Sequence, residues 1–218
     1  MADKQPAPSR QAGGQQRQIK LLVQALTGGA APVGRMPRGV QEQLESLLSG
    51  MLARSRYAQR QLLLSAGQLP EHLYYVEQGM VRGYYYDDAS GRAITLFLWR
   101  EASWAVPVQS FFHRQPSDLY LEVMPGSELL SFSYQQLTAL AEQLPAVEPL
   151  LRGLVLQYCA FHKKRTKDLL TRSAWERYLD LLQSHPRIEQ HVSKEVIASY
   201  LGVTPQSLSR LIRENGHP

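Results

Sequence analysis

Residues 192–215, close to the end of the chain, read VSKEVIASYLGVTPQSLSRLIREN, which is the pattern of two short helices joined by a tight corner. Gly202 stands where a left-handed residue is needed to end the first helix. Thr204 is placed to cap the second helix, and Pro205 follows at the first helical position, where its missing N–H costs nothing. Because these signals stop one helix and start the next within a few residues, the segment predicts a helix-turn-helix.

Each of the two helices is amphipathic, with an apolar stripe for a core and a polar face on the other side. Ser193 is expected to cap the first helix. Leu208, Leu211 and Ile212 form the apolar stripe of the second helix. Its outer face is the one that a DNA major groove would meet, and it carries Gln206, Ser207, Ser209, Arg210 and Arg213.

The distribution of charge favours a nucleic-acid partner over an ordinary helical bundle, which would also accommodate such a corner. Residues 1–151 carry 13 basic and 13 acidic side chains, whereas residues 152–218 carry 11 and 6, so the whole net charge of +5 lies in the last third. Phosphate contacts and counterion release would attract a polyanion to that third of the chain.

Short apolar runs broken by turn residues occupy the middle of the chain. They are rich in Leu, Val and Tyr, and Gly67, Gly79 and Gly126 lie in the corners between them. This pattern is typical of an antiparallel barrel or jelly roll. The expected strands are Gln61 to Leu64, Leu73 to Val76, Met80 to Tyr86, Ala93 to Trp99, Leu119 to Met124 and Glu128 to Phe132.

Helices are expected on both sides of the barrel. Apolar spacing predicts a short helix over residues 19–26, a longer one over 40–54 and a third over 173–184. Beyond Pro145, apolar residues recur at heptad spacing, which favours a helix packed along a symmetric partner over one packed only on its own barrel. The predicted seam consists of Val147, Leu151, Leu154, Tyr158 and Phe161.

These patterns divide the chain into four parts: a flexible tail (1–18), N-terminal helices with the barrel (19–144), a central dimerisation helix (145–170) and the helix-turn-helix unit (171–218). The single cysteine of the chain excludes an internal disulfide and a cysteine-ligated cluster. No apolar run is long enough to span a bilayer, so a cytoplasmic protein without a membrane partner is expected.

The order of barrel, long central helix and helix-turn-helix resembles the Crp/Fnr superfamily of bacterial transcription regulators. Two segments carry the resemblance, AWERYL at 174–179 with His185-Pro186, and IASYLGVTPQSLSR at 197–210. They look especially like the Bacteroidetes-type members, and the resemblance covers about residues 40 to 215. It implies an α+β protein with an antiparallel, cyclic-nucleotide-binding-like jelly roll, a dimerisation helix and an all-α, winged-helix-like helix-turn-helix domain. It also implies a dimeric transcription regulator rather than an enzyme.

The resemblance places Pro205, Gln206 and Arg210 at the positions that contact base edges. Arg210 suits a bidentate contact with guanine and Gln206 suits adenine, whereas Pro205 departs from the family because its side chain donates no hydrogen bond. The implied partners are a second copy of the chain, double-stranded DNA with an inverted repeat and, as a candidate, RNA polymerase. The predicted DNA-binding residues are Thr204, Gln206, Ser207, Ser209, Arg210 and Arg213.

The sensor barrel departs from members that bind cyclic nucleotides. Their Gly-Glu and Arg-Ser or Arg-Thr pairs fall at Ala105-Val106 and Pro116-Ser117 here, so neither pair is present. A buried phosphate without its arginine would be an unpaired charge, and cyclic AMP is not expected unless Arg114 substitutes. No cofactor is required, and the effector stays unknown. Residues that could line a pocket for another ligand, or simply fill the barrel, are Tyr84, Trp104, Gln109, Arg114 and Ser117.

Two other function classes stay open. Pro205 and the absent C-terminal wing leave room for a small-ligand-binding module whose degenerate helix-turn-helix serves protein interaction. A metal-dependent jelly-roll enzyme is the other class, but the six histidines are scattered without metal-ligand spacing, so no metal site and no catalytic residue are predicted. A haem site would need one axial histidine such as His72 or His113.

Overall fold

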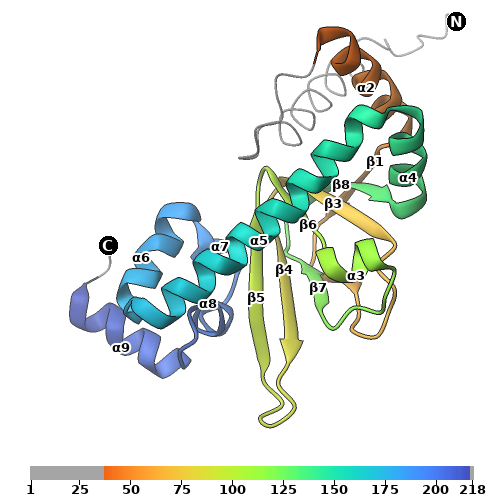
Figure 1. The fold of residues 1–218 in the computed structure, drawn as a ribbon. Coiled ribbons are helices and arrows are strands. Elements are labelled where there is room, and N and C mark those ends of the chain that lie inside the picture. Colours follow the sequence, from red (N-terminus) through yellow and green to blue (C-terminus); the bar gives the residue numbers. More distant parts are fainter. Residues whose placement is uncertain (1–36, 217–218) are drawn as a thin grey trace, which may run out of the picture.

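The structure is a computed structural model that describes residues 37–216, arranged about one long helix (Figure 1). The predicted tail 1–18 and helix 19–26 lie outside these residues. The strands are β1 (Ala53–Tyr57), β2 (Gln61–Leu64), β3 (His72–Gln78), β4 (Met80–Tyr86), β5 (Ala93–Arg100), β6 (Ser103–Ala105), β7 (Tyr120–Val123) and β8 (Ser127–Ser133). The helices are α2 (Arg38–Met51), α3 (Val108–His113), α4 (Tyr134–Gln143), α5 (Glu148–Thr171), α6 (Ala174–Ser184), α7 (Ile188–His191), α8 (Lys194–Leu201) and α9 (Pro205–Asn215), with a 3-10 turn at Pro145–Val147.

The strands form two four-stranded antiparallel sheets, in the orders β1-β8-β3-β6 and β2-β7-β4-β5. Gly79 makes the corner between β3 and β4 with a φ of +82°, and a Cβ there would lie 2.3 Å from Ser127 Oγ, so the corner requires glycine. Each of the six predicted runs overlaps one of the observed strands, and the predicted jelly roll is confirmed.

The prediction missed two strands, β1 and β6. The helix expected to run to Arg54 ends at Met51, and Arg54 lies in β1. Its guanidinium forms ion pairs with Glu77 of β3 (Nε to Oε2, 2.9 Å) and with Glu128 of the adjacent β8. The pairing of all five residues of β1 with β8 overrides the local helix preference. Strand β6 has only three residues, which is too few for a periodic signal.

Helices α2, α4 and the first half of α5 cover one face of the β1-β8-β3-β6 sheet. Leu44, Leu140 and Leu150 from these helices have at most 1% of their surface exposed and pack with Leu73 and Phe132 of the sheet. This cluster forms the main core of the barrel half and fixes the start of α5 on it.

Helix α5 and the turn before it bury two members of the predicted seam in their own chain, and the remaining members stay a prediction as a partner-facing surface. Val147 and Leu154 are 1% and 5% exposed and belong to the core of the barrel half. The rings of Tyr158 and Phe161 stack on Phe97 of β5, with centroids 5.6 and 5.4 Å apart. The heptad spacing marks an apolar stripe on α5, and part of this stripe packs against the neighbouring sheet.

The C-terminal helices share a second core with the barrel. Met80, Leu98 and Met124 of the barrel cluster with buried residues of the helix-turn-helix unit such as Tyr178 and Leu201. The described residues after β8 contain no strand, so the C-terminal unit is all-α and its described part has no wing strand. None of the described helices is long and apolar enough to cross a membrane.

The burial of Leu150 predicts its contribution to stability. Leu150→Ala should lower the free energy of unfolding by about 2–5 kcal/mol, because it leaves a cavity between α5 and the sheet. Leu62→Ala, at a leucine that is 45% exposed on β2, should cost less than about 1 kcal/mol. Urea denaturation followed by circular dichroism measures both values, and equal losses would contradict the assigned core.

Candidate nucleic-acid interface

Helices α8 and α9 form the predicted helix-turn-helix. Gly202 ends α8 in the left-handed conformation, with a φ of +70°. Thr204 caps α9, since its hydroxyl accepts a hydrogen bond from the backbone N–H of Ser207 at 3.1 Å, and Pro205 follows at the first helical position. Ser193 occupies the capping position of α8 in an extended conformation, but its side chain makes no capping hydrogen bond, so that part of the prediction is wrong.

The corner is held by apolar side chains and by one buried tyrosine. Ile197, Leu201 and Leu208 have at most 2% of their surface exposed. The fully buried Tyr178 of α6 packs with them, and its hydroxyl donates to Glu189 Oε1 at 2.8 Å. Burial raises the pKa of the Tyr178 hydroxyl, so it stays a neutral donor. The two helices therefore have a fixed mutual angle.

The predicted DNA-binding residues separate into two groups in the structure. Gln206, Arg210 and Arg213 are exposed on α9, and among residues 37–216 Arg210 forms a single ion pair, with Glu214 at 3.9 Å. The three hydroxyls bind their own helix instead. Thr204 donates to Ser207 Oγ at 2.9 Å, and Ser209 donates to the Pro205 carbonyl, also at 2.9 Å. The long side chains are thus the ones available for base contacts.

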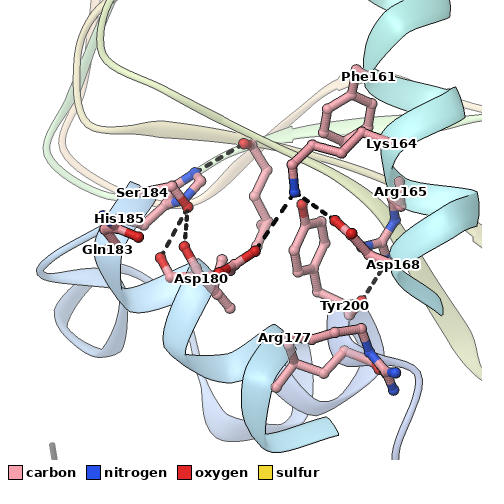
Figure 2. A pocket seen from close by; sticks show the side chains of 13 residues that line it. Phe161, Lys164, Arg165, Asp168, Arg177, Asp180, Gln183, Ser184, His185 and Tyr200 are labelled. Atoms are coloured by element: carbon pink, nitrogen blue, oxygen red, sulfur yellow. Dashed lines mark hydrogen bonds and ion pairs between the residues drawn. The ribbon is translucent and has the colours of Figure 1, made fainter. Parts of the chain in front are cut away.

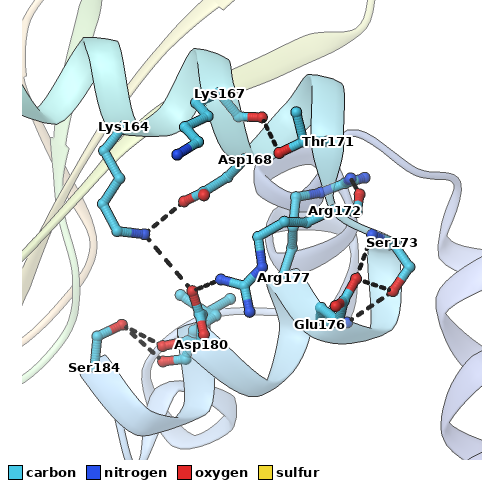
Figure 3. A network of polar contacts seen from close by, with 11 residues as sticks. Lys164, Lys167, Asp168, Thr171, Arg172, Ser173, Glu176, Arg177, Asp180 and Ser184 are labelled. Atoms are coloured by element: carbon cyan, nitrogen blue, oxygen red, sulfur yellow. Dashed lines mark hydrogen bonds and ion pairs between the residues drawn. The ribbon is translucent and has the colours of Figure 1, made fainter.

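A network of ion pairs joins α5 to α6 (Figure 3). Lys164 Nζ lies 2.5 Å from Asp168 of its own helix and 3.6 Å from Asp180 of α6, and Arg172 also pairs with Asp180. The hydrogen bond with Lys164 lowers the pKa of the Asp168 carboxyl and raises that of Lys164. Ser173 and Glu176 form a capping box at the start of α6. Sequence reasoning did not find this network, because it joins residues on two helices.

A hollow of about 400 Å³ lies where α5, α6, α8 and β5 meet (Figure 2). Leu98, Phe161 and Leu181 give it an apolar side, and Lys164 reaches across it toward Asp180. Its other lining residues are Arg165, Asp168, Arg177, Gln183, Ser184, His185, Tyr200 and Leu201. None of the residues predicted for a ligand pocket lines it.

The five predicted pocket residues lie on different elements of the fold, and four of them contact neighbours outside the predicted set. Tyr84 stacks on Tyr120 in the β2-β7-β4-β5 sheet, and burial raises its pKa to about 12. Trp104 lies in the other sheet and packs on Tyr75. Gln109 is exposed on α3. The remaining two residues are held by neighbours: Arg114 by Glu71, the Pro70 carbonyl and the Tyr134 ring, and Ser117 by the backbone of Leu119.

Aromatic rings fill the place where α5 crosses β5. Phe97 lies between Trp99 and the rings of Tyr158 and Phe161, at centroid distances of 4.6 to 5.6 Å. His162 completes the cluster at 5.1 Å from Phe97. Apolar residues spaced three and four apart along α5 predict an apolar surface on this helix. The spacing does not indicate that Phe97 packs on that surface. Among the described residues, no three or more His, Cys, Asp and Glu gather as a metal site.

The architecture of a jelly roll, a long crossing helix and a C-terminal helix-turn-helix defines the fold of the Crp/Fnr regulators. Solved structures of such regulators align with most of the chain. FixK2 from Bradyrhizobium japonicum matches with a TM-score of 0.63 and 18% identity, over 75% of this chain and 83% of that one. The c-di-GMP-responsive regulator CLP from Xanthomonas campestris matches with a TM-score of 0.60 and 18% identity, over 82% and 91%.

The catabolite activator protein from Thermus thermophilus gives a third match, with a TM-score of 0.52 and 22% identity, over 87% of this chain and 85% of that one. No protein-family model matches the chain, and no curated protein matches it in sequence. At these identities the likeness shows the fold, and the predicted Crp/Fnr resemblance is confirmed at that level.

Two half-buried histidines predict how stability changes with pH. Burial lowers the pKa of His162 and of His185 below the ordinary value of 6.5, and Arg165 and Arg100, respectively, act in the same direction. The unfolded chain therefore binds protons more readily, and the stability present above pH 6.5 is lost as the pH falls below it. The urea midpoint should drop between pH 7.5 and 5.5. In His162→Phe with His185→Gln this drop should be smaller, and an unchanged drop would contradict the assignment.

Proposed function

We propose that the protein is a dimeric, sequence-specific DNA-binding transcription regulator in which α9 is the recognition helix. The observation that carries the proposal is the outward face of α9, where Gln206, Arg210 and Arg213 are exposed on a helix whose other side is buried. The positive charge of the last third and the fold shared with known regulators support it. The protein has no enzymatic role and acts in the cytoplasm, with RNA polymerase as a candidate partner.

Arg210 and Gln206 are the base-reading residues in this proposal. Arg210 would contact guanine O6 and N7, and Gln206 would contact adenine. Thr204, Ser207 and Ser209, whose hydroxyls bind α9 itself, would approach phosphates only as secondary contacts that fix register. With two recognition helices related by a two-fold axis, the operator is an inverted repeat with half-sites roughly 34 Å apart.

The dimer would form along the solvent face of α5 rather than along the seam expected from the sequence. This face exposes Leu156 (60%) and Leu170 (81%), with Cys159 and Ala160 between them. Leucines this exposed at helical spacing favour burial against a second copy, because their apolar surface then leaves water.

No cofactor is required, and the barrel is not proposed to take cyclic AMP. Arg114, the one arginine near the position of the missing phosphate-binding pair, is bound to Glu71 Oε1 at 2.7 Å and to the Pro70 carbonyl at 3.0 Å. Using it for a phosphate would break both contacts.

Arg210→Ala tests base reading. Its affinity for the operator, selected from random fragments, should fall by roughly 1–3 kcal/mol, while binding to random DNA stays nearly unchanged. Fluorescence anisotropy at two salt concentrations measures both. Arg38→Ala is a matched control, since Arg38 is also exposed and pairs with a glutamate four residues on. Equal losses on both DNAs would argue against base reading. A wild-type protein without a specific complex would favour the protein-interaction module instead.

Cys159 tests the dimer, because it is the only cysteine of the chain and is exposed beside Leu156. A short bis-maleimide should link two copies in a covalent dimer on a denaturing gel. Leu156→Glu should abolish the link and give a monomer by light scattering, because a buried unpaired charge opposes the contact. Leu62→Glu, at an exposed leucine on β2, should retain both. A monomeric wild-type protein at micromolar concentration would refute this interface.

A further inference from the structure

Three consecutive residues in the last turn of α8 are bound to three different elements of the protein. We call residues 199–201 the α8 junction. Ser199 binds β5, Tyr200 binds α5, and Leu201 binds α6. The turn that leads into the recognition helix is therefore attached to β5 of the barrel, to the central helix α5 and to α6 at once.

Ser199 takes the place of a neighbouring strand. Strand β5 lies at the edge of the β2-β7-β4-β5 sheet, where one side of a strand lacks a strand partner. The Ser199 hydroxyl donates to the Ala93 carbonyl at 2.9 Å and accepts from the Thr95 N–H at 2.8 Å. One side chain thus satisfies a donor and an acceptor of the edge strand and fixes α8 along it.

Two arginines hold the next two carbonyls of the junction. The last carbonyls of a helix have no partner within it. The Arg165 guanidinium of α5 donates to the Tyr200 carbonyl and lies 3.9 Å from the centre of the Tyr200 ring. Arg177 of α6 donates to the Leu201 carbonyl from Nη2 at 2.9 Å and from Nε at 3.2 Å. These cations also suit the negative end of the α8 dipole.

The junction borders the hollow of about 400 Å³ (Figure 2), so close packing does not position it on that side. The polar contacts do so instead. Tyr200, Leu201 and both arginines line this space. Where close packing is interrupted, a few directional hydrogen bonds determine how the neighbouring elements are placed. Immediately after the junction, Gly202 turns the chain, and α9 starts at Pro205.

We propose that the α8 junction is the coupling element that sets the direction of the recognition helix relative to the barrel and the central helix. The proposal rests on the proposed DNA-binding function and extends it to Ser199 and Arg165 as positioning residues, neither of which touches DNA. A shift of β5 or of α5 must then move α9, because the junction is bound to both. The pair of recognition helices in a dimer would keep its spacing through these contacts.

Ser199→Ala tests the proposal, with wild-type protein in full length as reference. The substitution removes both hydrogen bonds to β5. The measured quantity is the ratio of the affinity for the operator to the affinity for a version whose half-site spacing is changed by one base pair. This ratio should fall about 3- to 10-fold. The Thr95 amide should exchange hydrogen about 3- to 10-fold faster, as should the amides of residues 207–210. Arg165→Lys, which keeps the charge but loses the planar stacking, should relax the spacing discrimination in the same direction.

Thr138→Ala is the matched control, since it also removes one hydroxyl, which binds the Tyr134 carbonyl within α4, and it should leave all three readouts unchanged. A folded Ser199→Ala protein with wild-type spacing discrimination and wild-type exchange at residues 207–210 would overturn the proposal. If wild-type protein binds no operator, the proposed function fails, and exchange at Thr95 and residues 207–210 still decides whether the junction holds α9.

Discussion

The crossing of α5 over the barrel is the contact on which the rest of the structure depends. At this point Tyr158 and Phe161 stack on Phe97, which in turn stacks on Trp99 at 4.6 Å. The rings fit because Gly83 lies beside them in β4. A Cβ at Gly83 would stand 2.8 Å from the Trp99 ring and 3.2 Å from that of Phe97. A single glycine thus permits the layer of rings that fixes the path of α5, and with it the position of the C-terminal helices.

Basic side chains have different surroundings in the barrel and on α9. In the barrel the buried Arg82 is held by Glu122 at 3.6 Å, by the Thr95 hydroxyl at 2.9 Å and by the face of Tyr84 at 4.3 Å. A buried cation needs such partners because it has lost its water. On α9, Arg210 remains in solvent with one distant carboxylate. The barrel therefore compensates its buried cation internally, and the exposed Arg210 of α9 stays available to an external anion.

Local signals made the helix-turn-helix and the strands predictable. Gly202, Thr204 and Pro205 act within a few residues of one another, so their effect can be read from the sequence alone. The partner of α5 could not be read in the same way, because a heptad seam records an apolar stripe and not what covers it. Pairing with β8 places Arg54 in β1 and not in the predicted helix, and this pairing again depends on distant residues.

The residues of the candidate site also differ in whether local sequence patterns predict their roles. The exposed face of α9 follows from helical periodicity, whereas Arg165, Arg177 and Ser199 gain their roles from backbone groups up to 106 residues away. The residues of the predicted ligand pocket lie on both sheets, on α3 and in loops, and their shared role stays a prediction. Side-chain type indicates which contacts are possible, and topology decides which are made.

A polar junction between α8 and the barrel also has a mechanical consequence that an apolar one would lack. Apolar surfaces can slide over one another at little cost, because the hydrophobic effect depends on buried area and not on direction. Hydrogen bonds weaken steeply when their angles change. Met80, Leu98 and Met124 can hold the helix-turn-helix unit against the barrel, but they leave its angle poorly determined. Ser199 and Arg165 supply that angle, and a helix that must enter a groove at a defined orientation needs the angle as much as the attachment.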